Sequence, residues 1–345
     1  MFKSTSLSNQ NRDGVVLAQK DIVMPWHHNL VDDPVTLSEH LIHRMHNDRN
    51  PLLITLEDKF ASRAYVEANS DCRLPELYHF IQADNFHIPW DELPERCVLK
   101  SNHWSGDSIF ILDNAKEPLP HLPRARFPKL RSGKQHGYYV IRKGRDQYGR
   151  FWPRWRIEMK LRRVLKKNFP ISLEWGAFNI KERGIMVEEF LVADDGGAPT
   201  DIKFHCFGGK VGYIQVESGR FGKEIKQNIH LPDGSLIDTL ADATKWFNDT
   251  SVGNLREHLG EERISKMIDI AERLSHEMDY VRVDLFLIGG SVYFGEFTNY
   301  PRSGQPQGPV WEALGGKCWR EARGVAPNAD QEKVVSEALD KRTNH

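Results

Sequence analysis

The sequence has few cysteines, and none of them is spaced for a metal site or a disulfide scaffold. The four cysteines are far apart, with no C-x-x-C pair and no histidine cluster beside them: Cys72, Cys97, Cys206 and Cys318. A structural zinc site and a disulfide-dense secreted scaffold both require closer sets of cysteines. The composition therefore argues against both classes of protein.

Long apolar stretches are also missing. No run approaches the roughly 18 residues that cross a bilayer, and the first residues show no signal-peptide pattern. The formal net charge is −1 over 345 residues, and 39% of the residues are hydrophobic. These values are typical of a globular protein with a sizeable core, and not of a disordered chain. We expect a cytoplasmic location.

One stretch departs from this neutral average. Between Arg124 and Lys167, 16 Lys and Arg stand against two acids, Asp146 and Glu158, with aromatic residues interleaved. Such a segment can bind nucleic acid, membrane headgroups or a polyanionic substrate. No zinc-finger, RNP or helix-turn-helix motif accompanies it, which argues against nucleic acid. An anionic-glycan surface, a peripheral membrane contact and a solvated face stay open.

Two strand-like runs around a Gly-Gly turn each carry a carboxylate in an apolar, aromatic setting. Side chains alternate between the faces of a strand, so Arg282 and Asp284 share one face of the first run. Glu296 and Thr298 likewise share one face of the second run. Directly paired positions lie about 5 Å apart at their Cβ atoms. Two carboxylates that close repel each other unless a cation lies between them, and hard oxygen ligands suit Mg²⁺ or Mn²⁺.

Whether these carboxylates meet depends on the loop of the hairpin. A loop of only Gly289 and Gly290 would place them on opposite sides of the sheet. A three-residue loop that includes Ser291 would pair Ile288 with Val292 and bring the carboxylates directly opposite each other, and such loops are common. The metal-site hypothesis therefore requires the three-residue loop, and a strict two-residue turn would count against it. The alternative is a pair of solvated carboxylates on a polar face.

Earlier segments contain further charged candidates. The run 97–99 is a candidate buried strand that ends at Lys100, and residues 101–107 form a loop of small and polar residues before a return strand at 108–112. Small residues let backbone N–H groups approach an anion, and a lysine at the strand end adds a positive charge. The unit is a phosphate-site candidate, although it is not a Walker motif.

Two other charged pairs have competing interpretations. Lys59 and Arg63 lie four residues apart in an expected helix near Asp58, so they share one helical face. A solvent-exposed helical face is a sufficient explanation for this pair. Asp201 and Lys203 share one face of a strand that should line the interior of a sheet. Buried charges require a partner or a ligand. The remaining expected elements are a helix at 155–167, a strand at 184–195, a hairpin at 202–216 and a helix at 262–279.

Five segments, taken in order, resemble the TupA-like ATP-grasp family of bacterial cell-surface polysaccharide clusters. They are LEDKFASRAYVE, LPERCVLKSNHWSGD, IMVEEFL, DIKFHCFGGKV and YVRVDLFLIGGSVYFGEFTNYPRSG, and the match runs from about Leu52 to Leu314. The resemblance implies an α+β (α/β) ATP-grasp fold, with the nucleotide held between two α+β subdomains. The expected divisions are an N-terminal helical and α/β region at 1–95, a central ATP-grasp subdomain at 96–190 with a basic insertion at 124–167, a C-terminal ATP-grasp subdomain with the metal site at 191–325, and a polar tail at 326–345.

The resemblance also implies which residues surround ATP. These are Lys100, Ser101, His103, Ser105, Gly106, Glu188, Glu189, Phe190, Leu191, Asp201 and Lys203. Lys100 matches a phosphate-contacting lysine, and the residues directly after it match a loop that closes over the phosphates. Glu188 matches the acid at the adenine amino group, and the backbone at Glu189 and Leu191 matches the hinge at the adenine edge. Asp201 and Lys203 match ribose-side and phosphate-side contacts.

At the metal end, Asp284 and Glu296 match the two carboxylates that bind Mg²⁺, for which Mn²⁺ is an alternative. Arg282 matches an arginine that faces the acyl phosphate and, with Lys203, completes the expected catalytic pair. Many ATP-grasp enzymes have E-x-N here, whereas this chain has Thr298, as in the E-x-T of the TupA-like family, and Asn299 follows one residue later. The third metal ligand is therefore open between Thr298 and Asn299.

The chemistry that the resemblance implies is carboxylate activation by ATP, followed by attack of an amine on the acyl phosphate. Phosphoryl transfer needs mainly positioning and charge neutralisation, which suits the cations and carboxylates above. The expected partners are ATP, an amino acid or other amine, and an anionic glycan or sugar-nucleotide acceptor that contains a uronic acid. A glycosyltransferase and a non-catalytic ATP-grasp binding protein are the alternative functions.

Overall fold

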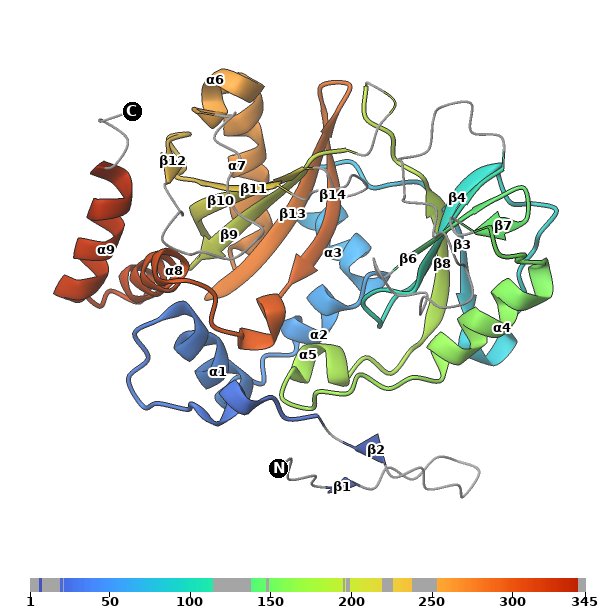
Figure 1. Ribbon diagram of the computed structural model, residues 1–345, viewed down its shortest axis with the longest axis horizontal. Coiled ribbons are helices and arrows are strands. Elements are labelled where there is room, and N and C mark those ends of the chain that lie inside the picture. The colour runs from blue at the N-terminus through green and yellow to red at the C-terminus, as the bar shows by residue number, and fades with distance from the viewer. Residues whose placement is uncertain are drawn as a thin grey trace.

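The computed structural model contains helices and two large sheets, as the α+β expectation requires. It describes residues 6–7, 19–20, 22–113, 138–146, 149–194, 196, 199–218, 226–237 and 253–340. Figure 1 shows the two sheets on either side of helices α2 and α3, with β13 and β14 on the side that faces these helices. None of the described helices combines the length and the apolarity that crossing a bilayer requires.

The first large sheet, here called the C-terminal sheet, has the strand order β12-β11-β10-β9-β13-β14, with β14 at one edge. Each pair of neighbouring strands in it is antiparallel. Its strands are β9 (Asp201–Phe207), β10 (Lys210–Ser218), β11 (Lys226–His230), β12 (Leu236–Ile237), β13 (Tyr280–Ile288) and β14 (Ser291–Thr298).

The second large sheet, here called the central sheet, has the order β3-β8-β4-β5-β6-β7. Only β5 and β6 are parallel among these strand pairs of the described chain. Its strands are β3 (Leu77–Gln82), β4 (Arg96–Ser101), β5 (Ser108–Leu112), β6 (Tyr138–Arg142), β7 (Arg145–Asp146) and β8 (Gly184–Glu189). A two-stranded pair, β1 (Ser6–Leu7) and β2 (Gln19–Lys20), lies near the N-terminus.

The helices cover the outer faces of the sheets and fill the space between them (Figure 1). They are α1 (Leu37–Asn47), α2 (Leu52–Glu57), α3 (Ala61–Asn69), α4 (Arg154–Leu165), α5 (Trp175–Phe178), α6 (Leu255–Leu259), α7 (Glu261–Ser275), α8 (Pro309–Ala322) and α9 (Ala329–Asp340). Short 3-10 turns lie at η1 (Pro25–His28), η2 (Ala83–Asn85) and η4 (Pro301–Gly304).

Apolar periodicity explains how these elements pack. In α7, Ile264, Met267, Ala271 and Leu274 recur at helical spacing, and all four are fully buried against the C-terminal sheet. The same apolar cluster includes β9 and β13 residues that alternate with charged ones, so the opposite face of these strands carries the charges. A second cluster packs α4 on the central sheet. The charged face of the C-terminal sheet is only partly polar, because Phe207, Tyr213 and Tyr280 on that face pack in another apolar cluster with α8.

The hairpin of β13 and β14 corrects the expected loop. Ile288 pairs with Ser291, so the loop contains only Gly289 and Gly290, and the predicted three-residue loop is wrong. Both glycines have positive φ, 56° and 74°, which is the conformation that a two-residue hairpin turn of the primed type requires.

The carboxylates nevertheless meet, because the register shifts further along the hairpin. Leu285 pairs with Phe294, whereas Asp284 pairs with Glu296, so Gly295 is an extra residue on β14. A bulge of this kind places two residues opposite one and restores the register that a two-residue turn alone would lose. The expected pairing of Asp284 with Glu296 is therefore confirmed, although the inference that a two-residue turn excludes it is wrong.

Two expected boundaries also change. The strand expected at 184–195 ends at Glu189, which leaves Phe190 and Leu191 outside regular structure. The helix expected near Asp58 begins at Ala61, so Lys59 precedes it and does not share a helical face with Arg63.

Candidate functional site

Four polar residues form one row across the C-terminal sheet. Lys203 on β9 pairs with Gln215 on β10 and with Asp284 on β13, and Asp284 pairs with Glu296 on β14. Cross-strand partners point to the same face of a sheet. The row therefore gathers side chains from two hairpins that lie far apart in the chain, as the 81-residue separation of Lys203 and Asp284 shows.

Asp284 is at the centre of this row and binds two cations. Its side chain is 2% exposed, and it accepts hydrogen bonds from Arg282 at 2.6 and 2.7 Å and from the Lys203 ammonium at 2.8 Å. Burial raises the pKa of the Asp284 carboxyl, but the charges of Arg282 and Lys203 outweigh it and hold the pKa well below its usual range. Asp284 is therefore ionised at neutral pH.

Lys203 is buried as well, and carboxylates surround its ammonium group. It donates to Asp201 and Asp284 and lies 3.5 Å from Glu217. Burial alone would lower the pKa of Lys203, but Asp284 and Asp201 raise it above its ordinary value. The ammonium therefore keeps its charge inside the protein, as the expectation of a partner for buried charges requires.

Glu296 connects this row to solvent. Its side chain is 40% exposed and lies 3.7 Å from the Arg282 guanidinium. Burial raises the pKa of the Glu296 carboxyl, but Lys59 and Arg282 lower it, with the net result below its ordinary value. Glu296 thus offers ionised carboxylate oxygens at the edge of the sheet, directly opposite those of Asp284.

These donors fit a hard divalent cation. Two ionised carboxylates at paired positions supply the oxygen ligands that Mg²⁺ prefers, and one of them reaches solvent. Within the described residues, no group of three or more His, Cys, Asp or Glu side chains is arranged for a metal. A cation here would therefore complete its coordination with ligands other than these side-chain types, as Mg²⁺ commonly does with water and phosphate.

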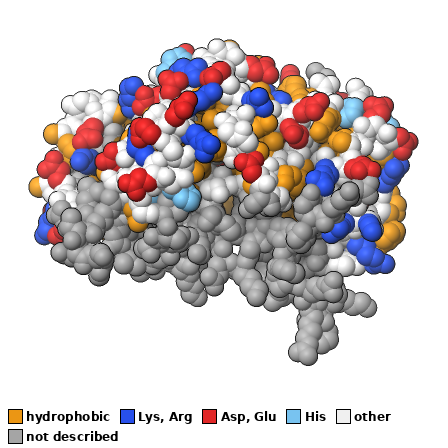
Figure 2. All heavy atoms as spheres, turned by 90° about the horizontal axis from the view of Figure 1, so that it is seen from above, with side chains coloured by type: hydrophobic (Ala, Val, Ile, Leu, Met, Phe, Trp, Pro, Cys, Tyr) orange, Lys and Arg blue, Asp and Glu red, His pale blue; other side chains and the backbone are white. Residues whose placement is uncertain are grey.

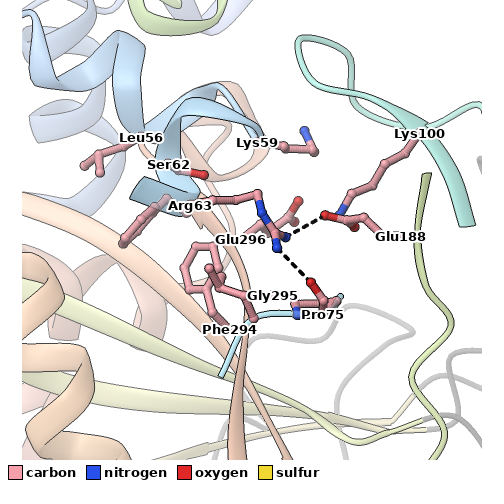
Figure 3. A pocket seen from close by; sticks show the side chains of 12 residues that line it. Leu56, Lys59, Ser62, Arg63, Pro75, Lys100, Glu188, Phe294, Gly295 and Glu296 are labelled. Atoms are coloured by element: carbon pink, nitrogen blue, oxygen red, sulfur yellow. Dashed lines mark hydrogen bonds and ion pairs between the residues drawn. The ribbon is translucent and has the colours of Figure 1, made fainter. Parts of the chain in front are cut away.

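The two sheets meet at a pocket beside β14 (Figure 3). The pocket is lined by Leu56, Lys59, Ser62, Arg63, Leu74, Pro75, Lys100, Glu188, Phe294, Gly295, Glu296 and Phe297. Glu188 on β8 accepts from Lys100 on β4 at 2.6 Å and from Arg63 on α3 at 3.1 Å. Figure 3 shows these three side chains converging near Glu296. One pocket therefore contains Lys100 and Glu188, which were expected around ATP, and Glu296, which was expected at the metal.

Lys59 and Arg63 differ from the interpretation of a solvated helical face. Both line the pocket, and Arg63 also donates to the backbone carbonyl of Pro75 at 2.8 Å. Its side chain is 15% exposed. The pocket thus contains three cations, Lys59, Arg63 and Lys100, and two carboxylates.

The loop at 101–107 has a buried base and an exposed tip. Ser101 is 3% exposed and His103 is 4% exposed, whereas Ser105 is exposed and Gly106 is half-buried with a φ of 81°. Burial, together with the charge of Arg183, lowers the pKa of His103 to about 4, so its ring is neutral at pH 7. Asp107 ends the loop with a φ of 58°.

Asp107 ties this loop to the basic segment. It accepts from Lys160 on α4 at 2.9 Å and from Lys167 at 2.6 Å, and Lys167 also lies over the Trp104 ring. Further along, Arg154 pairs with Asp91. Several cations of the basic segment therefore have partners within the protein. Residues 124–137 and 147–148 of this segment lie outside the described residues.

The expected hinge follows the end of β8. Glu189 is the last residue of the strand and donates its backbone N–H to the Glu76 carbonyl at 2.8 Å. Phe190 packs against Phe110 of β5, with ring centroids 5.7 Å apart. The half-buried Leu191 comes next, beyond the strand.

Thr298 and Asn299 point in different directions. Thr298 pairs with Arg282 across the hairpin, so it lies on the face that carries Asp284 and Glu296. Asn299 is completely buried and donates its side-chain amide to the backbone carbonyl of Leu53 at 2.9 Å. Of the two candidate third ligands, Thr298 is the one on the carboxylate face.

Sequence reasoning missed two carboxylates beside this site. Glu57 accepts from the backbone N–H of Asn299 at 2.9 Å, and burial raises the pKa of its carboxyl. Glu174 is 8% exposed. Burial and the charge of Glu57 raise the pKa of its carboxyl to about 8, although a hydrogen bond from Ser303 lowers it. The signal available in the sequence was a single glutamate in each of two apolar runs, LLITLE and ISLEW.

Comparison with known proteins gives one family and several similar structures. Residues 154–310 match the model of a family described as TupA-like ATPgrasp. No curated protein matches the sequence. The structure is similar to D-alanine–D-alanine ligase from Bacillus anthracis, with a TM-score of 0.38 and 14% identity over 84% of this chain and 69% of that chain.

Two other solved structures are similar in the same degree. N5-carboxyaminoimidazole ribonucleotide synthetase from Thermus thermophilus gives a TM-score of 0.35 and 11% identity over 80% of this chain and 54% of that chain. VanG D-Ala:D-Ser ligase from Enterococcus faecalis gives a TM-score of 0.36 and 11% identity over 82% of this chain and 61% of that chain. TM-scores below 0.5 do not establish a shared function.

Proposed function

Because residues 154–310 match the TupA-like ATP-grasp family, we propose that the chain is an ATP- and Mg²⁺-dependent carboxylate–amine ligase. In the proposed reaction the γ-phosphoryl group passes from ATP to a carboxylate oxygen, which gives ADP and an acyl phosphate. The amine nitrogen then attacks the acyl carbon, and inorganic phosphate leaves as the amide bond forms. ATP-grasp ligases form carbon–nitrogen bonds in this way.

The observation that carries this proposal is the charged row on the C-terminal sheet. Lys203 and Arg282 both bind Asp284, and Glu296 opposite them reaches the pocket that Lys100 and Glu188 line. Phosphoryl transfer depends on positioned cations and metal-binding carboxylates more than on a protein nucleophile. The row supplies both kinds of group, next to a pocket between two sheets.

In the proposed complex, Asp284 and Glu296 hold Mg²⁺, which would neutralise phosphate charge. Lys100 and Lys203 bind phosphate oxygens, and Arg282 faces the reacting carboxylate. The ion pairs that Lys203 and Arg282 make with Asp284 hold both cations ready on the same face. Asp201 and the hinge at 189–191 are proposed contacts for the ribose and the adenine.

We propose a uronic-acid carboxylate, in a surface polysaccharide or its precursor, as the group that is activated, and an amino acid as the amine. The loop after β14 supports an anionic substrate. Arg302 and Ser303 have positive φ values of 51° and 57°, a conformation that is costly for residues other than glycine and that gathers at functional sites. Trp26 holds this loop by donating to the Ser303 carbonyl at 2.9 Å.

Arg302 is exposed, and the structure records no ion pair for it with any described residue. Arg302 lies four residues after Thr298 and is therefore available to bind a substrate carboxylate. Replacing it, as Arg302→Ala, should raise the apparent KM for the carboxylate substrate while the KM for ATP stays unchanged. The matched variant Arg263→Ala, on the exposed side of α7, should change neither constant. Equal effects on both substrates would remove Arg302 from the acceptor site.

An ADP-release screen tests the proposed function. The purified protein is incubated with ATP, Mg²⁺, each of the twenty amino acids, and uronic-acid oligosaccharides or sugar nucleotides. We expect ADP and phosphate only where a carboxylate and an amine are both present. Release of a nucleoside diphosphate from a sugar nucleotide without ATP would instead indicate a glycosyltransferase. ATP binding without turnover across the whole panel would indicate a binding protein.

A further inference from the structure

The outer face of α4 combines the most exposed large apolar side chain of the described protein with exposed cations. Trp155 is 64% exposed, the highest value among the large hydrophobic residues of the described chain, and Met159 is 38% exposed. Leaving an indole ring in water is unfavourable, and a tight group of such side chains indicates a binding surface. Trp155 and Met159 are four residues apart, so they lie on one side of the helix.

Three cations continue this side of the helix. Arg162, Arg163 and Lys166 line a shallow groove together with Trp155 and Met159. All three cations are exposed, and the structure records no ion pair for any of them within the described part of the chain. Arg163 donates to the Met159 sulfur at 3.4 Å. We call Trp155, Met159, Arg162, Arg163 and Lys166 the α4 outer face.

Glu158 also lines this groove, but its carboxylate does not cancel the positive charge of the neighbouring cations locally. Glu158 accepts a hydrogen bond from the Trp90 indole at 2.7 Å, so its carboxylate is turned toward the protein. Arg162 donates to the Phe86 carbonyl at 2.9 Å and lies over the Phe86 ring, so the α4 outer face presents Arg163 and Lys166 as its outward positive charges beside a projecting indole ring. Figure 2 shows hydrophobic and basic side chains gathered at the end of the molecule where Figure 1 places α4 and the central sheet.

This face lies away from the candidate active site. Ile157 and Leu161 of α4 pack on Leu99 and Val187 of the central sheet. Side chains alternate along a strand, so Lys100 and Glu188, the next residues along β4 and β8, point to the opposite side of the same sheet. A molecule bound at the α4 outer face is therefore separated from the reacting groups by the sheet.

The separation decides between two anionic partners. A glycan chain held on the α4 outer face would bring no carboxylate to Arg282, because the sheet lies between them. A membrane surface needs no such path, since it holds the whole protein. Indole and thioether groups favour the headgroup region, and each nearby cation adds attraction to anionic lipids.

We propose that the α4 outer face docks this protein on a bilayer that contains anionic lipids. Trp155 and Met159 enter the headgroup region, while Arg163 and Lys166 contact lipid phosphates. Docking leaves the pocket on the other side of the central sheet open to soluble substrates. This inference goes beyond the proposed ligase activity and does not depend on it.

Vesicle co-sedimentation of the full chain tests the docking surface. We expect the protein to pellet with vesicles of phosphatidylcholine containing phosphatidylglycerol, to pellet less with phosphatidylcholine alone, and to be released as salt is added. The double variants Trp155→Ser with Met159→Ser, and Arg163→Gln with Lys166→Gln, should each weaken binding to anionic vesicles at least about tenfold.

Two matched variants serve as controls. Val325→Ser removes another exposed apolar side chain, which is 42% exposed, and Arg263→Gln with Lys333→Gln removes two exposed cations, one on α7 and one on α9. Both should bind anionic vesicles like the unchanged protein. Far-UV circular dichroism and melting curves establish that each variant is folded.

Three results would overturn the proposal. The first is no binding to anionic vesicles, and the second is an equal loss of binding in the control variants. The third is tighter binding to soluble polygalacturonate than to vesicles through these same residues, which would make the face a glycan site.

Discussion

At the scale of single residues, the charge of each group in the site depends on its partners. Asp284 is 2% exposed yet ionised, because Arg282 and Lys203 both donate to it. Removing one partner of such a buried set leaves an uncompensated charge, which costs more than the pair itself contributes. Variants of Asp284 therefore risk unfolding, whereas the half-exposed Glu296 can be changed without this cost.

Glu296→Gln keeps the size of the side chain and removes its charge. We expect ADP release in the presence of Mg²⁺ to fall at least about 100-fold, because one of the two anionic ligands is lost. The melting temperature should change little, since the side chain is 40% exposed. Glu262→Gln, at an exposed position of α7, is the control and should retain full activity. Normal turnover by Glu296→Gln would refute the metal-site assignment.

Glu174 should make stability depend on pH. Its pKa of about 8 in the folded protein, against 4.5 in the unfolded chain, means that the folded state binds more protons between these values. The free energy of unfolding should therefore fall as the pH rises from about 4.5 to 8. Below this range the stabilising contribution of protonated Glu174 is fully present. In Glu174→Gln this slope should be shallower, as urea titrations at pH 5 and pH 8 would measure. Identical slopes in the two proteins would contradict the assignment.

At the scale of elements, two hairpins of the C-terminal sheet use the same device. In each, a two-residue Gly-Gly turn is followed by a register shift on the return strand, at Gly212 in β10 and at Gly295 in β14. A Cβ at Gly295 would lie 2.9 Å from the Phe286 ring and 3.0 Å from the Asp284 carbonyl oxygen. Glycine at this position therefore allows the bulge that aligns Glu296 with Asp284.

Changes at Gly295 test the stability of the bulge and the register of the site separately. Gly295→Ala should lower the free energy of unfolding by about 1–3 kcal/mol, because a backbone oxygen cannot move aside easily. Deleting Gly295 removes the extra residue and leaves Leu285 opposite Phe294 and Asp284 opposite Glu296, so the folded deletion variant should retain turnover. Urea unfolding and ADP release measure the two effects.

The matched control is Gly290→Ala in the turn of the same hairpin. A Cβ there meets no atom within 4 Å, although the φ of 74° is strained for alanine. Gly290→Ala should lower the free energy of unfolding by about 1 kcal/mol and leave turnover intact. If the Gly295 deletion is folded but inactive, the pairing of Asp284 with Glu296 is not sufficient for turnover.

At the scale of the whole molecule, the pocket belongs to both sheets. Lys100 and Glu188 come from the central sheet, Glu296 from the C-terminal sheet, and Arg63 from the helix between them. A ligand in this pocket touches both halves of the structure, so its binding should raise the free energy of global unfolding.

ATP with Mg²⁺ should therefore raise the melting temperature in a concentration-dependent way. At a ligand concentration about 100 times Kd the added stability is about 2.7 kcal/mol. Adding EDTA should remove the metal-dependent part of the shift and leave the part due to ATP alone. In Glu296→Gln, EDTA should have no further effect, whereas Lys100→Ala should weaken the shift by ATP itself. Absence of any shift in the unchanged protein would contradict a nucleotide site here.

Much of the fold could be read from local patterns. The helical stripe of α7, the strand β5 at Ser108–Leu112 and the β9–β10 hairpin follow from apolar spacing, because helices and strands repeat with different periods. The pairing of Asp284 with Glu296 was also expected. The loop that was thought necessary for it was wrong, because a bulge has no local sequence signature beyond a glycine, and glycine also marks turns.

The sequence by itself therefore determined the elements, the family resemblance and the residue types of the site. Only the tertiary structure decided which groups meet. Arg63 joins Glu188 across 125 residues, and Lys167 joins Asp107 across 60 residues. The physical reason is that the charge state and availability of an ionisable side chain depend on burial and on partners from distant segments. Local periodicity determines the face of an element, but long-range packing determines what that face contacts.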